Sequence, residues 1–361
     1  MPLDAYRSLG RSGLRVSPFC LGGMTFGEEW GYGSDEAGSS AIIQRYTELG
    51  GNFIDTANMY TLGHSEAIIG KHFEGRRGER NRVVIATKFS ANMSPGDPNG
   101  GGSSRKAILA ACEESLRRLR TDYIDLYWMH WWDQFTPIEE TMSALDSLVQ
   151  SGKVRYVGFS DTPAWKVAQA QVTAMFRNWA PIVGLQIEYS LLERTVESEL
   201  TPMALELGLG VTPWSPLRAG ALSGKYSRDN TTPESAGRGP SLSRNLTPKA
   251  FDVIDVLLAV AKEAETSAAS VALAWVLAQP AVTSPIIGAR TLDQLTDNLQ
   301  ALEVRLTTDQ LTRLNEVSTP PADFTALNMR GAMSGSFGGL TVNARTFPLG
   351  LRSVTENDKV W

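Results

Sequence analysis

The stretch I-D-L-Y-W-M-H (residues 124–130) is short, apolar and aromatic, and it is followed by P-I-E-E-T-M-S-A-L-D-S-L-V-Q (137–150) and V-R-Y-V-G-F (154–159). The first and third segments have the length and the side chains of buried strands. The middle segment carries apolar residues at helical spacing and opens with a proline cap signal. The three segments therefore predict a strand, a crossover helix and a second strand, which is the repeating unit of a parallel sheet.

The same alternation continues in both directions along the chain, and we count eight such units. The predicted strands are Phe19 to Leu21, Asn52 to Asp55, Val83 to Lys88, Ile124 to His130, Val154 to Phe159, Gly184 to Glu188, Gly210 to Trp214 and Ser284 to Ile287. Eight repeated β-α units predict an α/β fold of the (β/α)8 type, the TIM barrel. Because 361 residues is close to the size of one such barrel, we expect a single domain over residues 1–361.

Several other segments fit around a barrel of this kind. Residues 6–16 predict a β-hairpin around Gly10 to Gly13 that closes one end of the barrel. Further crossover helices are predicted at Ser34 to Leu49, Ser103 to Leu119 and Pro163 to Asn178. Residues 267–278 are apolar nearly all round, which favours an additional helix packed inside the ring before the last strand.

Two stretches lack the alternation and are predicted to be long loops. They are Leu217 to Thr247, rich in Gly, Ser, Pro and Arg, and Thr319 to Trp361 at the C-terminus. Long loops in a compact enzyme are commonly lids or binding loops, and simple disorder is the alternative.

Composition argues against several classes of function. The 34 Lys and Arg and 39 Asp and Glu residues give a net charge of −5 without a long basic run, so no nucleic-acid partner is expected. The sequence has neither an apolar leader nor an apolar run of membrane-spanning length, so we expect a cytoplasmic protein with no membrane partner. The two cysteines, Cys20 and Cys112, form no disulfide framework, and His64, His72 and His130 lack zinc-site spacing, so no metal is expected.

Nucleotide-binding motifs of other enzyme classes match poorly. The stretch G-A-L-S-G-K-Y (220–226) superficially resembles a phosphate loop, but its glycines are too close together and tyrosine follows the lysine. No G-x-G-x-x-G follows a predicted strand. The sequence therefore favours neither an ATPase nor a Rossmann dehydrogenase.

Four polar residues lie at or near the ends of predicted strands, where TIM barrels form their active sites. Asp55 ends N-F-I-D, Tyr60 follows in T-A-N-M-Y, Lys88 ends V-V-I-A-T-K and His130 ends I-D-L-Y-W-M-H. A phenol with a pKa of about 10 is a poor acid near neutrality unless a cation, here Lys88, stabilises its phenolate. An ionised Asp55 would keep the lysine charged, and His130 could hydrogen-bond the substrate oxygen. The four residues together predict a proton-transfer site.

At these residues the chain resembles the aldo-keto reductase superfamily, whose Asp, Tyr, Lys and His match Asp55, Tyr60, Lys88 and His130 in order and context. The resemblance covers nearly all of the chain and includes L-G-G-M-T-F-G (21–27), G-N-F-I-D-T-A (51–57), G-K-V-R-Y-V-G-F-S (152–160), Q-I-E-Y-S (186–190), W-S-P-L (214–217) and I-I-G-A-R (286–290). It implies an NADP(H)-dependent oxidoreductase that reversibly transfers a hydride between nicotinamide and a carbonyl, with Tyr60 as general acid and base.

The resemblance also implies where nicotinamide would bind. Ser160, Asp161 and Gln186 would hold its carboxamide, and Trp214, followed by Ser215, would stack on the ring and leave the other face open. The superfamily often has Asn where this chain has Asp161. An ionised carboxylate accepts a hydrogen bond from the carboxamide but cannot donate one, so Asp161 departs from the family pattern.

For the adenosine end of the cofactor, the resemblance points to Gly288-Ala289-Arg290, followed one and two helical turns later by Gln294 and Asn298 on a shared face. Arg290 could pair with the 2′-phosphate that distinguishes NADP(H) from NAD(H), and the helix N-terminus supplies backbone donors. Residues of the first long loop would clasp the pyrophosphate, namely Leu217, Leu222, Gly224 and Lys225.

Tryptophans indicate the kind of substrate. Trp30 follows the first strand, and Trp131 and Trp132 follow His130 in a strand-end loop, with Trp128 just before it. Aromatic side chains in this position favour a wide pocket for a bulky aldehyde or ketone. Two alternatives stay open: a channel-associated regulatory β-subunit of the same superfamily, and a sugar or polyol dehydrogenase that differs only in its loops.

Overall fold

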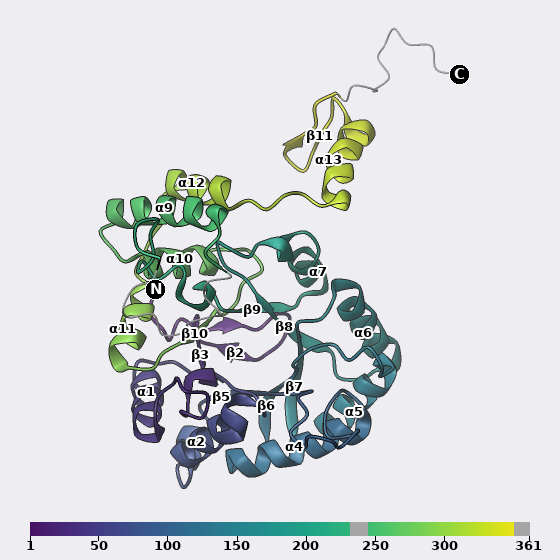
Figure 1. Ribbon diagram of the computed structural model, residues 1–361. Helices are drawn as coiled ribbons and strands as arrows, with labels where there is room; N and C mark the ends of the chain where they lie inside the picture. The colour runs from purple at the N-terminus through teal and green to yellow at the C-terminus, as the bar shows by residue number, and fades with distance from the viewer. Residues whose placement is uncertain (232–244, 350–361) are drawn as a thin grey trace. The chain divides into compact units, whose positions relative to one another are not determined.

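The computed structural model describes residues 1–231 and 245–349 (Figure 1). The chain divides into two compact units, one spanning residues 1–318 and one beginning at Thr319. The first unit contains all the residues expected to bind cofactor or substrate. The single domain expected over residues 1–361 stays a prediction.

Eight parallel strands form one sheet in the first unit. They are β3 (Cys20–Gly22), β4 (Phe53–Asp55), β5 (Val84–Phe89), β6 (Ile124–Met129), β7 (Val154–Ser160), β8 (Ile182–Glu188), β9 (Gly210–Trp214) and β10 (Ile286–Gly288), in the order β10-β3-β4-β5-β6-β7-β8-β9. Near the remaining seam, the Val211 amide donates to the Ala281 carbonyl (3.1 Å) and the Thr283 amide donates to the Val211 carbonyl (2.8 Å). These bonds join the two ends of the sheet, and the predicted (β/α)8 barrel is confirmed.

Helices surround the strands (Figure 1). They are α1 (Glu36–Glu48), α2 (His64–Phe73), α3 (Arg77–Arg80), α4 (Arg105–Leu119), α5 (Ile138–Gln150), α6 (Ala164–Arg177), α7 (Leu200–Leu207), α9 (Pro248–Glu263), α10 (Ala268–Leu277), α11 (Leu292–Gln300) and α12 (Thr308–Ser318). The four predicted crossover helices correspond to α1, α4, α5 and α6 and differ only slightly at their ends. The predicted additional helix is α10, and nearly all of its residues are buried.

Side-chain caps explain where several helices begin. The side chains of Asp35, Ser104, Ser267 and Thr291 accept hydrogen bonds from backbone amides in the first turns of α1, α4, α10 and α11. Each cap satisfies an amide that the first turn of a helix leaves unpaired. Polar residues that precede apolar periodic segments therefore set the boundaries of these elements.

The predicted hairpin closes the N-terminal end of the barrel. Strands β1 (Arg7–Ser8) and β2 (Arg15–Val16) pair antiparallel, and the Arg11 amide donates to the Gly208 carbonyl (2.7 Å) just before β9. Leu9 and Val16 are fully buried in an apolar cluster with residues of the barrel strands, including Trp128. This end of the barrel is therefore filled with apolar side chains.

The interior position of Trp128 explains two glycines in neighbouring strands. A Cβ at Gly158 would lie 2.3 Å from the indole, and a Cβ at Gly184 would lie 2.8 Å from it. Trp128 is itself fully buried. It therefore belongs to the barrel core and does not line the predicted aromatic pocket.

The first predicted long loop is largely irregular where the structure describes it. Between β9 and residue 231 it contains only the short 3-10 helix η4 (Arg218–Gly220), and α9 begins after the cap residue Thr247. The part of this prediction at residues 232–244 lies outside the described residues.

The second predicted long loop is wrong over much of its length. The unit that begins at Thr319 contains helix α13 (Phe324–Phe337) and a hairpin of β11 (Thr341–Val342) and β12 (Arg345–Thr346). Asn343 and Ala344 adopt left-handed backbone conformations at the hairpin turn, and the rings of Phe337 and Phe347 lie 5.5 Å apart. The helix has no clear amphipathic stripe and the strands have two residues each, so neither produced a periodic signal.

Candidate active site

The four residues expected to carry proton transfer lie together at the C-terminal end of the barrel. Asp55 is the last residue of β4, Lys88 lies near the end of β5, and His130 directly follows β6. Tyr60 begins the 3-10 helix η2 (Tyr60–Gly63) after β4. Neighbouring parallel strands end at the same edge, so residues far apart in sequence meet here. We refer to Asp55, Tyr60, Lys88 and His130 as the tetrad.

Lys88 is the centre of the tetrad. Its side chain is fully buried, and its ammonium group forms an ion pair with Asp55. Nζ also donates hydrogen bonds to the Thr56 carbonyl (2.9 Å) and to the Tyr60 hydroxyl (3.1 Å). These three acceptors use the full donor capacity of an ammonium group, so its position beside the phenol is fixed.

Burial and charge act in opposite directions on these groups. Burial disfavours the charged ammonium, but Asp55 and Tyr60 outweigh that effect and raise the pKa of Lys88. Burial raises the pKa of Tyr60, with the Lys88 charge opposing it, and burial likewise raises the pKa of Asp55 against the same charge. Lys88 is therefore a stable cation and Tyr60 a neutral phenol, which is the form that can donate a proton.

His130 is neutral at this site. Burial, helped by the nearby Lys88 charge, lowers the pKa of His130 to about 2. Its ring packs edge-on against Tyr60 with centroids 5.8 Å apart, and its buried Nδ1 has no hydrogen-bond partner among the residues that the structure describes. A neutral imidazole beside the phenol can bind a substrate oxygen without competing for its proton.

The turn that carries Tyr60 is strained and firmly held. Thr61 and Leu62, which are not glycines, have φ of 47° and 59°. The Thr61 hydroxyl donates to the Phe26 carbonyl (2.8 Å) and accepts from the Ser65 amide (3.0 Å). Left-handed backbone at such residues persists only where surrounding contacts enforce it, and it is common at functional sites.

A second support for this turn escaped the sequence analysis. In α2, Glu66 is fully buried, forms an ion pair with Arg118 of α4 (2.6 Å) and accepts a hydrogen bond from the Thr87 hydroxyl (2.5 Å) on β5. These contacts fix the start of α2 against the strand that carries Lys88. A glutamate within the apolar stretch H-S-E-A-I-I-G (64–70) was the available signal, because a buried carboxylate needs partners.

The residues expected to hold nicotinamide lie at the ends of three neighbouring strands, β7, β8 and β9. Ser160 pairs in register with Gln186, and the Gln186 amide donates to Asp55 (2.9 Å), which connects this group to the tetrad. The Trp214 indole donates to the Asp161 carboxylate (3.0 Å). The buried Ser160 hydroxyl has no partner in the described part of the chain. An unpartnered hydroxyl on β7 and an aromatic ring at the end of β9 fit a ligand that carries both a carboxamide and a flat ring.

The residues expected at the adenosine end differ from their predicted arrangement. Helix α11 begins at Leu292 after the cap Thr291, so Arg290 lies outside the helix. The Gln294 side chain accepts from the Arg290 amide (2.9 Å), and the Asn298 side chain donates to the Gly288 carbonyl (3.0 Å). The shared helical face therefore holds only for Gln294 and Asn298, which brace the turn. The Arg290 guanidinium makes no hydrogen bond or ion pair with the described residues and stays available for an anion.

The loop residues expected to clasp a pyrophosphate follow Trp214. Ser215 has a left-handed backbone (φ 52°), and its hydroxyl accepts from the Ala219 amide (3.1 Å). The Leu222 amide donates to the Leu217 carbonyl (3.2 Å), so in this conformation that amide is not free for an anion. Gly224 and Lys225 are exposed, and they remain the accessible members of this predicted set.

The three predicted substrate residues separate into two places. The ring of Trp30 packs edge-on against Tyr60 (6.2 Å), and that of Trp131 lies 4.5 Å from His130. The ring of Trp132 instead packs edge-on against Trp165 of α6 (5.4 Å) and lies against the core. The structure therefore brings Trp30 and Trp131 to the tetrad, whereas Trp132 packs against α6 and the core.

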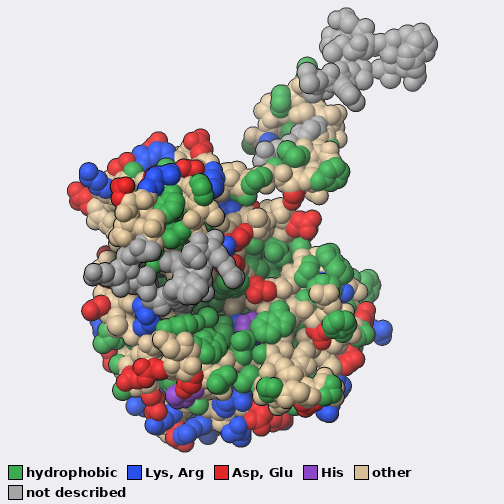
Figure 2. All heavy atoms as spheres, in the orientation of Figure 1, with side chains coloured by type: hydrophobic (Ala, Val, Ile, Leu, Met, Phe, Trp, Pro, Cys, Tyr) green, Lys and Arg blue, Asp and Glu red, His purple; other side chains and the backbone are tan. Residues whose placement is uncertain are grey.

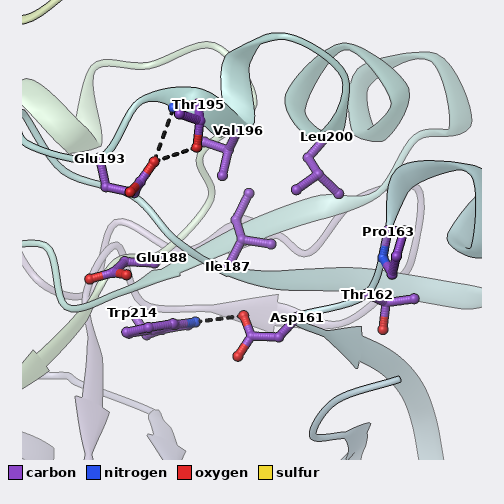
Figure 3. A pocket seen from close by; sticks show the side chains of 10 residues that line it. All are labelled: Asp161, Thr162, Pro163, Ile187, Glu188, Glu193, Thr195, Val196, Leu200 and Trp214. Carbon is purple, nitrogen blue, oxygen red and sulfur yellow. Dashed lines mark hydrogen bonds between the residues drawn. The ribbon is translucent and has the colours of Figure 1, made fainter. Parts of the chain in front are cut away.

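An open cavity of about 400 Å³ adjoins Asp161 and Trp214 (Figure 3). Its lining also includes Glu188, Glu193 and apolar side chains such as Leu200 of α7. In the space-filling view, hydrophobic side chains surround a hollow near the middle of the face shown, with acidic side chains beside it (Figure 2). The mouth of the barrel thus combines apolar walls with negative charge.

Two features are absent from the described residues. No group of three or more His, Cys, Asp or Glu side chains is arranged to hold a metal ion. None of the described helices combines the length and apolar character needed to cross a membrane.

Comparison with known proteins gives a consistent result. A family model described as the aldo/keto reductase family matches residues 18–319. An uncharacterized oxidoreductase of Bacillus subtilis is 41% identical over 325 residues, covering 88% of this chain and 96% of that protein. An NADP(+) aryl-alcohol dehydrogenase of Phanerodontia chrysosporium is 36% identical over 322 residues, covering 84% and 83%. Norsolorinic acid reductase B of Aspergillus parasiticus is 35% identical over 345 residues, covering 92% and 88%.

Proposed function

The chain belongs to the aldo/keto reductase family, and we propose that it is an NADP(H)-dependent oxidoreductase that interconverts bulky, preferably aromatic, carbonyl compounds and their alcohols. The observation that carries this proposal is the hydrogen bond of 3.1 Å from the Lys88 ammonium to the Tyr60 hydroxyl. It places a permanent cation beside a neutral phenol, at the barrel end where strand-end residues converge. This is the arrangement that a proton donor to a carbonyl oxygen requires.

Each tetrad residue has a distinct task in this proposal. Tyr60 donates its proton to the carbonyl oxygen during reduction and accepts it back during oxidation. Lys88 stabilises the phenolate that the transfer leaves, and Asp55 fixes the ammonium in place. His130, being neutral, hydrogen-bonds the substrate oxygen and directs it toward the phenol. The nicotinamide cofactor supplies the hydride when it is bound.

The family resemblance, together with the positions of the strand ends, supports a set of residues that would hold this cofactor. Ser160, Gln186 and Asp161 face the nicotinamide carboxamide in our proposal, and Trp214 provides the stacking surface. The Arg290 guanidinium has no partner among the described residues and would take the 2′-phosphate of NADP(H), because a guanidinium matches a phosphate in charge and shape. Gly224 and Lys225 are the accessible loop residues for the pyrophosphate.

An aromatic substrate has support from two directions. The rings of Trp30 and Trp131 lie against Tyr60 and His130, so a substrate whose oxygen meets the tetrad would contact aromatic surface. Two similar proteins are named aryl-alcohol dehydrogenases, and another is named norsolorinic acid reductase B. The aromatic rings at the tetrad and the aryl-alcohol names both favour aromatic carbonyl compounds over sugars.

The direct test is a panel of substrates assayed with NADPH and, for the reverse reaction, with NADP+. The panel contains aromatic aldehydes, polycyclic ketones, short aliphatic aldehydes and sugars, and consumption or production of reduced nicotinamide is followed by absorbance. We expect repeated turnover and the highest kcat/KM for aromatic carbonyls. A higher kcat/KM for a sugar or polyol would show that the proposed aromatic substrate class is wrong. If the bound cofactor reacts once and no repeated turnover follows, the result would instead support a regulatory role.

The NADP(H) preference has its own test in Arg290→Ala. A charge-assisted contact to phosphate contributes roughly 1.5–3 kcal/mol, so this change should weaken NADPH binding by about 10- to 150-fold and barely affect NADH. Fluorescence titration of both cofactors measures the effect. Arg117→Ala removes an arginine of α4 that forms an exposed ion pair with Glu114, and it serves as the matched control. Equal loss for NADPH and NADH would contradict the role of Arg290.

A further inference from the structure

Asp161 and Trp214 form a contact that bridges the C-terminal ends of β7 and β9. Asp161 directly follows β7 and Trp214 ends β9, and β8 lies between these strands in the sheet. Figure 3 shows the indole nitrogen directed at the carboxylate, and the two atoms are 3.0 Å apart. An indole nitrogen is only a donor and a carboxylate only an acceptor, so the direction of this hydrogen bond is fixed. The bond therefore restricts the plane of the Trp214 ring.

The backbone at Asp161 explains how the carboxylate reaches this place. Its φ is 40°, in the left-handed region, and its amide donates to the Gln186 carbonyl (3.1 Å). Asp and Asn adopt this conformation more readily than most side chains do. The turn therefore favours a short polar side chain at this position, and the chain carries Asp, the charged member of the Asp and Asn pair.

Charge at this wall of the mouth is not balanced. Glu188, which pairs in register with Trp214, and Glu193 both face the guanidinium of Arg218, at 2.5 and 3.6 Å. Asp161 has no Lys or Arg within 4 Å among the residues that the structure describes. Its carboxyl is accessible at the mouth, where partial burial raises its pKa against the Trp214 N–H and the Lys88 charge. When it is ionised, Asp161 contributes a negative charge next to Trp214 that no described Lys or Arg pairs.

We infer that Asp161 has two effects on the cofactor: it orients Trp214 as a stacking surface, and its charge makes the site hold oxidised NADP+ more tightly than NADPH. This inference rests on the proposed function. The nicotinamide ring is cationic when oxidised and neutral when reduced, whereas all other groups of the two forms are the same. A fixed carboxylate beside the ring therefore attracts only the oxidised form.

The same carboxylate also sets the orientation of the carboxamide. Asp161 can accept a hydrogen bond from the carboxamide NH2 but has no hydrogen to offer its carbonyl. The Ser160 hydroxyl, which is buried without a partner among the described residues, can donate to that carbonyl. An Asn at position 161 could hydrogen-bond either the NH2 or the carbonyl of the carboxamide. An ionised Asp can hydrogen-bond only the NH2, so it fixes the orientation of the carboxamide.

Two substitutions separate the effects. Asp161→Asn removes the charge, keeps an oxygen that can accept from Trp214, and suits the left-handed backbone. Asp161→Ala removes both the charge and the acceptor. Glu199→Gln removes an exposed charge just before α7 and serves as the control for a change in net charge. For each protein, the Kd values of NADP+ and NADPH are measured by fluorescence titration near pH 8, which requires no turnover.

In Asp161→Asn we expect NADP+ to bind on the order of tenfold more weakly, with NADPH within about twofold of the wild-type value. Glu199→Gln should leave the ratio of the two Kd values unchanged. In Asp161→Ala the ratio of the two Kd values should shift as much as it does in Asp161→Asn. NADPH should also bind several-fold more weakly, because the Trp214 indole is no longer held. The proposed role of Asp161 in orienting Trp214 is overturned if NADPH binds Asp161→Ala and Asp161→Asn equally well.

The charge effect is overturned if Asp161→Asn leaves the ratio of Kd values unchanged or weakens both cofactors equally. Those outcomes leave the proposed function standing, because the wild-type protein still binds both cofactors. If the wild-type protein binds neither NADP+ nor NADPH, the proposed function itself fails and the inference fails with it.

Discussion

The two ends of the barrel use the same strands for different purposes. At the N-terminal end, Leu9 and Val16 of the hairpin region join Trp128 in an apolar cluster, and these three side chains are fully buried. At the C-terminal end, the same strands finish in a buried ion pair between Lys88 and Asp55 and in polar atoms of His130 and Ser160 that have no hydrogen-bond partner among the described residues. The first end is filled with apolar side chains, and the second keeps hydrogen-bonding capacity for a ligand.

The difference teaches where stability and function are separated in this chain. Burial of apolar surface stabilises the folded state by about 25 cal/mol per Å², whereas a buried ion pair often fails to repay the desolvation of its charges. The hairpin end therefore contributes stability that the tetrad end does not. Substitutions at the tetrad end should therefore change kcat, and substitutions at the hairpin end should change the free energy of unfolding.

The largest expected effect is on turnover at the tetrad end. Tyr60→Phe removes the hydroxyl that Lys88 contacts and should lower kcat by about 10²- to 10⁴-fold, the range for a lost acid-base group. Cofactor affinity should stay nearly unchanged, because the ring remains in place. Steady-state kinetics with the best carbonyl substrate and a cofactor titration measure both. A turnover close to that of the wild type would remove Tyr60 from its proposed role.

The matching experiment at the closed end is Leu9→Ala. Truncating a fully buried leucine typically lowers the free energy of unfolding by about 2–5 kcal/mol. Denaturant unfolding measures this, and kcat should be retained by the protein that remains folded. Leu205→Ala, at a leucine of α7 that is 55% exposed, is the control and should change stability by less than about 0.5 kcal/mol. A large loss of kcat in folded Leu9→Ala would contradict the separation of the two ends.

Sequence periodicity was sufficient to predict the barrel because its strands are buried on both faces. Each of β3 to β10 coincides with a short apolar run, and the polar residue that ends such a run, as in Asp55, marks the C-terminal edge. The tetrad could be predicted for the same reason, since strand-end residues of a parallel barrel must converge. The resemblance to a known family added the roles of these residues and the cofactor.

Contacts that depend on the path of a loop could not be predicted in this way. Arg290 and Gln294 are four residues apart, but the helix starts only at Leu292, so the expected shared face did not form. Trp131 and Trp132 are adjacent and point to different neighbours. The Asp161 to Trp214 bond crosses β8 and requires a left-handed residue. Such features depend on local backbone angles that no hydrophobic pattern encodes.

A smaller effect concerns the dependence of stability on pH. The folded pKa of His130 is lowered to about 2 from an ordinary value of 6.5, so below pH 6.5 the unfolded chain binds a proton that the native chain does not. Stability from this group is complete above pH 6.5 and decreases as the pH falls, by at most about 2 kcal/mol at about pH 5. His130→Asn should remove this contribution to the slope of the free energy of unfolding against pH. Equal slopes for the two proteins in denaturant unfolding would contradict a neutral, buried His130.

The smallest expected effect distinguishes the two adjacent tryptophans at the open end. Trp131 is 38% exposed and its ring lies against His130, so Trp131→Ala should raise KM several-fold for bulky aromatic aldehydes and less for short aliphatic ones, because lost apolar contact scales with area. Trp132 packs against Trp165 and the core, so Trp132→Ala should lower the free energy of unfolding and change KM for both substrates equally. Steady-state kinetics with matched aldehydes, together with unfolding curves, measure the pair. If Trp132→Ala instead discriminated by substrate size and Trp131→Ala did not, the wall of the substrate site would lie toward α6, and the separation of these two residues would be wrong.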